Sequence, residues 1–247
     1  TNYVLPTSAS TAAGGASITP APLTMTANDL TTFVGVSIAN INSQYQLSGL
    51  LGSDTASTAI SSPTVSYTVS LNTAIASPTL NALTPNASSS NYSLSFVKGS
   101  LMVADNYQMI VNAGSNTAIY GAVNSSNISY LGDALSSGSS VTAGYCTNCG
   151  QAGVTSPTII NLAITAPAAG SNIWIAADSG SGSAQGKYSF AISPTVLSGS
   201  YGAGANLNVG NYVLTAANLA TVTGFTTRYA LDKPIIYNAG NLSITPK

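Results

Sequence analysis

The stretch Gly-Asn-Leu-Ser-Ile-Thr-Pro at residues 240–246 is one of three copies of a motif that decides the architecture. Gly-Gly-Ala-Ser-Ile-Thr-Pro occupies residues 14–20, and Gly-Ser-Leu-Met-Val occupies residues 99–103. Each copy follows a segment that begins at a tyrosine: Tyr3, Tyr92 or Tyr229. Self-similarity at long spacing is the signature of a chain built from like units. We therefore expect an array of similar β modules.

The composition is unusually poor in charge. Only 4% of the residues are charged, against roughly 25% in ordinary soluble domains. The formal net charge is -1, so no basic surface exists for nucleic acid, and we predict no nucleic-acid partner. No apolar run approaches the ~18 residues of a spanning helix, so we predict no membrane span. A fold with so few titratable groups depends little on pH or salt, which favours an extracellular, cell-surface location.

Alternating apolar and polar residues recur along the whole chain. They are typical of half-buried β-strands, and the segments between them are rich in Gly, Ser, Asn and Pro. The clearest examples are residues 21–27, 65–71, 92–97 and 211–215. Short helical turns are expected only near residues 52–57 and 132–135, where Asp or Ser can cap them. The pattern predicts an all-β chain of tandem elongated β modules, either β-sandwiches or β-grasp-like sheets.

The copies of the motif also set the expected domain boundaries. Residues 1–20 are interpreted as the end of a preceding module or as donor strands, and residues 21–105 as the first complete module. Residues 106–247 form the second module, with an insertion at about 140–200. A second pair of anchors supports this division, because Thr-Phe-Val-Gly at 32–35 recurs as Ala-Ile-Tyr-Gly at 118–121.

These motifs resemble the MBG repeats of large bacterial surface exoproteins, which include the filamentous-haemagglutinin-type adhesins. The resemblance rests on residues 17–29, on Ile-Tyr-Gly-Ala at 119–122 and on the closing motif at 240–246. It covers most of residues 1–135 and 200–247, whereas residues 140–200 depart from it. It implies an extracellular, elongated all-β array tied to adhesion, and it supplies no catalytic residues.

The sequence lacks the residue types that most often act as catalytic acids and bases. The chain has no histidine and no glutamate, so Ser-His and Cys-His pairs are excluded and we predict no enzyme and no cofactor. The six aspartates are scattered, which favours no metal site. A calcium ion at turn residues Asp29, Asp105 and Asp133 stays open as an alternative.

Two kinds of covalent modification are suggested by the sequence. Cys146 and Cys149 are too few to complete a four-ligand zinc site without histidine, so we predict a disulfide that stiffens a turn. Five Asn-x-Ser/Thr sequons are candidate glycosylation sites: Asn86, Asn91, Asn124, Asn127 and Asn241.

The aromatic residues have two interpretations. Core packing is the default for the tyrosines that alternate with aliphatic residues: Tyr67, Tyr92, Tyr107, Tyr212 and Tyr237. Tyr145, Trp174 and Tyr201 lie in or beside the 140–200 segment, and the alternative interpretation is that they form a ligand face for host or cell-surface glycans.

Two functions follow from these observations. The first is a non-catalytic structural or adhesive repeat segment, a stalk of a bacterial surface adhesin, whose partners are neighbouring modules and glycans. The alternative is a subunit of an extracellular filament, assembled head to tail when residues 1–20 add as strands to the next copy.

Overall fold

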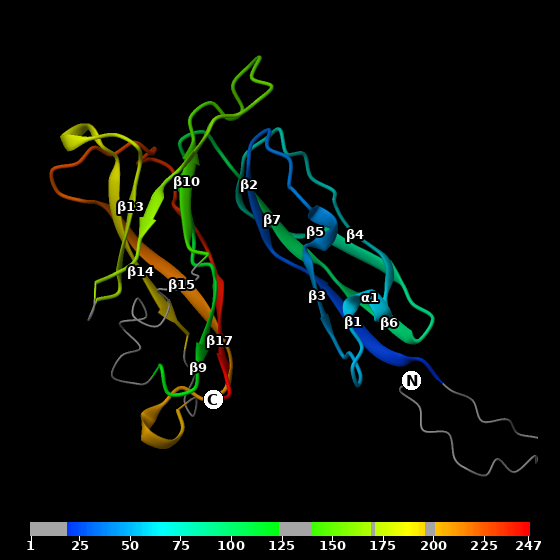
Figure 1. Ribbon diagram of the computed structural model, residues 1–247. Helices are drawn as coiled ribbons and strands as arrows, with labels where there is room; N and C mark the ends of the chain where they lie inside the picture. The colour runs from blue at the N-terminus through cyan, green and yellow to red at the C-terminus, as the bar shows by residue number, and fades with distance from the viewer. Residues whose placement is uncertain (1–18, 124–139, 169–170, 196–200) are drawn as a thin grey trace, which may run out of the picture. The chain divides into compact units, whose positions relative to one another are not determined.

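The computed structural model describes residues 19–123, 140–168, 171–195 and 201–247 and shows an all-β protein with one short α-helix (Figure 1). The described strands form four sheets. The chain divides into two compact units, which are treated separately below. Unit 1 comprises residues up to Val103, and unit 2 comprises Ala104–Lys247 together with Phe33–Val36 and Asn72–Ala76.

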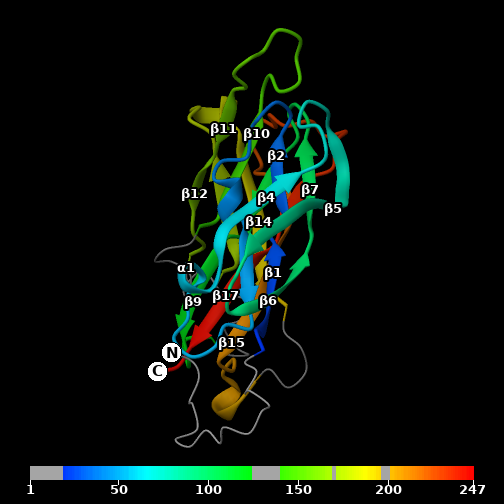
Figure 2. The same cartoon turned by 90° about the vertical axis from the view of Figure 1, so that its right-hand side faces the viewer.

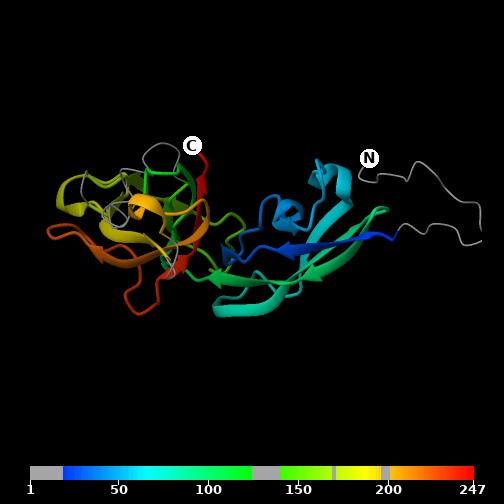
Figure 3. The same ribbon diagram turned by 90° about the horizontal axis from the view of Figure 1, so that it is seen from below.

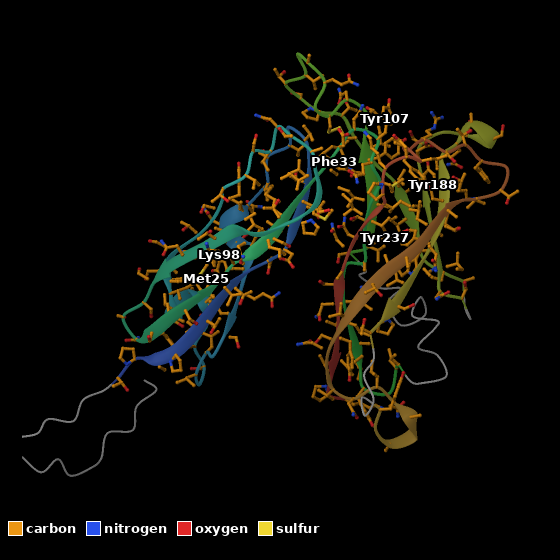
Figure 4. All side chains as sticks on the ribbon, turned by 180° about the vertical axis from the view of Figure 1, so that it is seen from behind. Met25, Phe33, Lys98, Tyr107, Tyr188 and Tyr237 are labelled. Atoms are coloured by element: carbon orange, nitrogen blue, oxygen red, sulfur yellow. A yellow bond between two sulfur atoms is a disulfide. The ribbon has the colours of Figure 1, made fainter. Side chains whose placement is uncertain are left out.

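Unit 1 contains a three-stranded and a four-stranded sheet. The first has the order β3-β1-β6 and the second the order β2-β7-β5-β4. The strands are β1 (Ala21–Ala27), β2 (Leu30–Phe33), β3 (Tyr45–Ser48), β4 (Ser61–Tyr67), β5 (Ile75–Ser88), β6 (Tyr92–Val97) and β7 (Gly99–Ala104). The alternation in β1 buries Leu23 and Met25, the latter labelled in Figure 4, while the residues between them stay partly exposed.

The expected helical turn at residues 52–57 is present, four residues downstream of the predicted start. Helix α1 (Ala56–Ala59) begins after Thr55, whose backbone N–H donates to Thr58 Oγ1 at 2.9 Å. The cap is therefore a threonine and not the Asp or Ser that the sequence suggested. The second expected turn, at 132–135, lies outside the described residues. A 3-10 turn, η1 (Ile41–Ser43), precedes β3.

Unit 2 contains a four-stranded and a six-stranded sheet around one core. The orders are β11-β10-β8-β16 and β12-β13-β14-β15-β17-β9. The strands are β8 (Ile110–Asn112), β9 (Ser115–Ile119), β10 (Thr142–Cys146), β11 (Ile159–Asn161), β12 (Ala163–Thr165), β13 (Ile173–Ala177), β14 (Lys187–Pro194), β15 (Gly210–Thr221), β16 (Ile236–Asn238) and β17 (Gly240–Thr245). Two 3-10 turns, η3 (Gly182–Ala184) and η4 (Ala203–Ala205), interrupt the loops.

The core of unit 2 draws on residues that were expected to lie in an insertion. Strand β14 is an interior strand of the six-stranded sheet, and its Tyr188, Phe190 and Ile192 are fully buried, as is Trp174 of β13. Residues 140–200 thus supply five strands, β10 to β14, to the two sheets of this unit. The segment predicted as an insertion therefore contributes to the core of unit 2.

Both units share one arrangement of their first and last strands. In unit 1, β1 leads into β2 (in blue in Figure 2) and β6 leads into β7, and each pair passes from one sheet to the other. In unit 2, β8 and β9 make the same passage, as do β16 and β17. The first strand pairs in parallel with the late strand in each unit: β1 with β6, and β8 with β16. Figure 3 shows β1 (blue) and β17 (red) in their respective units.

The register of this pairing is the same in both units. Met25 lies opposite Phe96 in unit 1, and Val111 lies opposite Tyr237 at the corresponding position of unit 2. The backbone bonds at the far end also correspond. After β2, Val34 N–H donates to the carbonyl of Ala104, the last residue of β7, at 3.0 Å, and after β9, Tyr120 N–H donates to the carbonyl of Thr245, the last residue of β17, at 2.8 Å. In the division into compact units, Val34 and Ala104 are themselves counted in unit 2.

The close approach of two backbone segments explains why the repeated motif has a glycine in both units. A Cβ added to Gly99 would lie 2.5 Å from Asn28 O, and a Cβ added to Gly240 would overlap Gly114 O. Asn28 and Gly114 occupy the same place, between the two early strands. The late strands therefore cross the early strands where they change sheets, and only a residue without a side chain fits.

The tyrosine that was expected to start each copy does not correspond in the two units. Tyr92 is the buried first residue of β6, but Tyr229 lies in an irregular segment before β16. The prediction of core packing is also wrong for three tyrosines, Tyr67, Tyr107 and Tyr237, which are 40%, 40% and 37% exposed. Tyr3 lies outside the described residues. The glycine and the aliphatic positions, not the tyrosine, define the repeat.

Candidate functional site

The paired first and last strands are the structural feature of each unit that bears most directly on function. In unit 1 six residue pairs join β1 to β6. In unit 2 three pairs join β8 to β16 and five join β9 to β17, all in parallel. Side chains add to these ladders, because Thr24 and Ser95 hydroxyls lie 2.9 Å apart and Asn238 Nδ2 donates to Asn112 Oδ1 at 2.6 Å. The two early strands of each unit are thus bonded to its late strands: β1 to β6 in unit 1, and β8 to β16 and β9 to β17 in unit 2.

The cysteines form a disulfide in the structure, at the end of β10. Both cysteines are buried, and the turn between them is held by Asn148, whose Oδ1 accepts the backbone N–H of Thr158 at 2.5 Å. Tyr107 N–H donates to Cys146 O at 2.7 Å, and the Tyr107 ring stacks on Tyr145 with centroids 6.3 Å apart. The disulfide therefore pins a turn against the segment that opens unit 2.

The aromatic ligand face is not present as expected. Tyr145 is 3% exposed and Trp174 is 0% exposed, so both are core residues of unit 2, which contradicts the expectation for them. Tyr201 is half-buried and packs against the same core. Burial of these rings is favoured because each removes a large apolar area from water. The sequence signal was the alternation in Ile-Trp-Ile-Ala at 173–176, which indicates a strand with Trp174 facing inward.

Three of the five sequons can be placed. Asn86 in β5, Asn91 before β6 and Asn241 in β17 are exposed. Asn124 and Asn127 lie outside the described residues. Exposure permits glycosylation at the three placed positions, and the glycosylation itself remains a prediction.

Asp178 organises the glycine-rich loop after β13. Its carboxylate accepts the N–H groups of Gly180 and Gly186 at 2.8 and 3.0 Å, and Arg228 Nε lies 2.9 Å from Oδ2. The Arg228 guanidinium also donates to Ala184 O, and Gln185 Nε2 donates to Asp178 O at 2.9 Å. The loop Ser-Gly-Ser-Gly-Ser at 179–183, which looks like the loosest stretch of the sequence, is tied at both ends.

We predict that Asp178→Asn loosens this loop and lowers the free energy of unfolding by about 2 kcal/mol, because hydrogen bonds to a charged acceptor are lost in a largely buried position. Thermal unfolding followed by far-UV circular dichroism checks the loss, and hydrogen exchange of residues 179–186 should accelerate. Asp232→Asn removes an exposed carboxylate and serves as the matched control. Unchanged exchange of the loop in Asp178→Asn would contradict the assignment.

A second ion pair joins the start of unit 2 to the segment before β16. Lys233 Nζ lies 2.8 Å from Asp105 Oδ2 and donates to Asn106 O at 2.7 Å. Partial burial raises the pKa of Asp105, but the hydrogen bond from Lys233, the Asn106 N–H and the Lys233 charge together outweigh it and lower the pKa. Its contribution to stability is therefore present above the ordinary pKa of an aspartate and is lost as pH falls through the lowered value. The same carboxylate is occupied by Lys233, which argues against the calcium alternative at this position.

The other two aspartates of that alternative do not assemble a site either. Asp29 Oδ1 accepts the backbone N–H of Ser100 at 2.6 Å. Asp133 lies outside the described residues. Within the described ranges, no three Asp or Cys side chains gather closely enough to hold a metal ion.

The buried phenol of Tyr188 in unit 2 has a raised pKa and therefore ionises only at strongly alkaline pH. Desolvation raises the pKa of Tyr188 to about 12, aided by Tyr145, Asp178 and Tyr229 nearby and opposed by the N–H that Arg228 donates to its hydroxyl. Tyr229 meets the Tyr188 ring edge-on, with centroids 5.4 Å apart. Tyr188 is labelled in Figure 4.

We predict that stability is nearly constant from about pH 5 to 9 and falls as pH rises from 10 to 12. A pKa that is higher in the folded state makes the unfolded state lose its proton first, so the stabilisation is complete below pH 10 and lost above it. The loss reaches roughly 3 kcal/mol once pH exceeds 12. Urea unfolding at a series of pH values measures it. Tyr188→Phe should flatten this decline and Tyr67→Phe should not; equal slopes in both variants would contradict the prediction.

No protein-family model matches the chain, and no curated protein or solved structure matches it. Among the helices that the described residues form, none is both long enough and apolar enough to cross a bilayer. Function is therefore inferred from the geometry of the units.

Proposed function

We propose that this chain is a non-catalytic, extracellular structural and adhesive protein, a repeat segment of a bacterial surface adhesin or stalk. In this proposal each unit is a two-sheet β module of the kind that the MBG resemblance implies. The observation that carries the proposal is the parallel pairing of early with late strands in each unit: β1 with β6, β8 with β16 and β9 with β17.

Parallel first and last strands resist tension for a geometric reason. Pulling β1 by its N-terminal end and β7 by its C-terminal end slides β1 against β6 along their common axis. All six residue pairs of that ladder then share the load and must break together. The same holds in unit 2, where β8 and β9 slide against β16 and β17. A stalk that anchors a cell against flow needs modules that stay folded under such a load.

The composition supports the same role. A chain with 4% charged residues and no histidine keeps its fold across the pH and salt conditions met outside a cell. The few charges that the structure places in ion pairs, Asp178 with Arg228 and Asp105 with Lys233, fix loops. Adhesive contact with neighbouring modules or with surface glycans would be made by the segments between the paired strands.

Single-molecule force spectroscopy tests this function. Handles at Thr19 and Lys247 load both units in series, and we expect two high-force unfolding events per molecule. Handles at Thr19 and Ser53 are the matched control. This pair opens the antiparallel β1/β3 ladder from one end, one bond after another, because Thr24 lies opposite Ser48 at that end. Unfolding of both units at forces no higher than the control would overturn the proposal.

A filament subunit is the second candidate, and one observation favours it. Strand β6 is the outer strand of its sheet among the described residues, and it exposes Phe96 and Val97 at 41% and 47%. An outer strand without charged side chains along it can accept a strand from another copy. Negative-stain electron microscopy decides this: fibres with a constant axial repeat that vanish on deletion of residues 1–18 support the filament, and discrete particles exclude it.

A further inference from the structure

Unit 1 has a hollow of about 510 Å³ between the turn that precedes β3 and the start of β4. Its apolar lining consists of Ile38, Ile41, Tyr45 and Pro63, all of which are half-buried. Asn40, Asn42 and Ser43 line it as well, and these polar residues are exposed. The hollow thus combines a partly buried apolar wall with an exposed rim of amides and a hydroxyl.

The backbone around the hollow is held in place by specific bonds. Asn40 has a left-handed conformation with φ of 50°, and its carbonyl accepts the Ser43 hydroxyl at 2.8 Å. Asn42 Oδ1 accepts the backbone N–H of Val65 at 3.2 Å and thereby ties η1 to β4.

Strand β4 is itself irregular at this place. Its register with β5 shifts between Ser61 and Thr64, and Ser62 has a positive φ of 49°. A bulge of this kind re-aims the residues beside it, and such conformations persist only where the surrounding structure fixes them. Pro63, which lines the hollow, lies within this irregular stretch.

The chemistry of the lining selects one class of ligand. No lining residue is charged, so nothing here compensates the charge of a phosphate, a carboxylate, an ammonium or a metal ion. A neutral ligand with one apolar face and several hydroxyl groups fits both parts of the lining. A pyranose ring has this character: its C–H face packs against an aromatic ring such as Tyr45, and its hydroxyls pair with amides. The volume lies within the range of small-molecule sites.

We propose that this hollow binds a neutral saccharide, with Tyr45 as the stacking residue and Asn40 and Ser43 as hydrogen-bonding residues. The site adds a ligand to the structural role and stands or fails independently of it. It also differs from the glycan face expected in or beside the 140–200 segment, where Tyr145 and Trp174 are buried. The open hollow implies weak, rapidly reversible binding.

The test uses the full chain labelled with ¹⁵N and titrated with lactose, cellobiose, chitobiose and mannobiose. We expect at least one disaccharide to shift the amide resonances of residues 38–45 and of the residues around Pro63. Sialyllactose should bind no more tightly than lactose, since the lining offers no positive charge. Uncharged extended peptides are titrated separately, to test whether the hollow binds a peptide and not a sugar.

The variants separate ligand contact from folding. Tyr45→Ala should weaken binding roughly tenfold, the effect expected on losing one aromatic stacking surface. Tyr67→Ala, which removes an exposed tyrosine from β4 of the same unit, should leave affinity unchanged. Asn40→Gly is the sharpest variant, because glycine keeps the left-handed backbone and deletes only the amide.

Three results would overturn the inference. The first is a titration in which no saccharide shifts the resonances of residues 38–45. The second is a peptide that shifts them while the sugars do not. The third is equal affinity in Tyr45→Ala, Asn40→Gly and the Tyr67→Ala control, which would place the sugar elsewhere.

Discussion

Gly240→Ala is expected to destabilise unit 2 by about 3 kcal/mol or more, and Gly99→Ala is expected to do the same to unit 1. In each case the new Cβ meets backbone atoms at the crossing, the carbonyl of Gly114 or that of Asn28. Backbone atoms held in two ladders cannot move aside as a flexible side chain can, so the cost lies at the upper end of overpacking effects. Hydrogen exchange resolved by segment reports the loss in each unit.

The control for these variants is Gly153→Asn. A Cβ there meets nothing within 4 Å, and asparagine tolerates the local φ of 80°. We expect this variant to unfold like the wild-type protein. If Gly240→Ala and Gly99→Ala were as stable as Gly153→Asn, the close crossing of early and late strands would be refuted in both units.

Trp174→Ala is expected to cost unit 2 about 3–5 kcal/mol, the usual range for emptying a buried tryptophan site. The residue is fully buried on β13 and belongs to the single core that both sheets share. Urea unfolding followed by far-UV circular dichroism measures the loss. A ligand-binding tryptophan on the surface would instead leave stability unchanged when replaced.

Trp174→Phe provides the comparison. The indole N–H of Trp174 is buried and has no hydrogen-bond partner in the structure, so phenylalanine removes an unpaired donor together with some volume. We expect a cost of less than about 1.5 kcal/mol. Equal losses for the two variants would show that the site depends on the indole itself and not on filling the core.

The sequence predicts the fold class because strand alternation and turn residues are local signals. The positions of Gly99 and Gly240 also carry information on domain organisation. Their repetition indicates like units, and the structure shows the same crossing of strands at both glycines. Tyrosine was a poor marker, because a tyrosine fits a strand, a turn or an edge equally well. Tyr229 lies in an irregular segment although it precedes the motif as Tyr92 does.

Less of the candidate site than of the fold class could be predicted from the sequence. Which strands pair across 70 or more residues depends on tertiary contacts that a local pattern does not encode, so the parallel pairing of β1 with β6 was not foreseen. The hollow beside Tyr45 is flanked by positive-φ residues at Asn40 and Ser62, and a local sequence pattern does not predict such conformations at these positions. The burial of Trp174 was encoded in the alternation of its strand, but reading residues 140–200 as an insertion led to the expectation of an exposed ring.

The most direct test of the account is a nuclear Overhauser measurement of strand register in the labelled chain. We expect backbone contacts between Met25 and Phe96 in unit 1 and between Val111 and Tyr237 in unit 2, each in the pattern of parallel strands. Both units would then share one arrangement of their first and last strands. Absence of the contact in either unit, or a register shifted by one residue in one of them, would contradict the account.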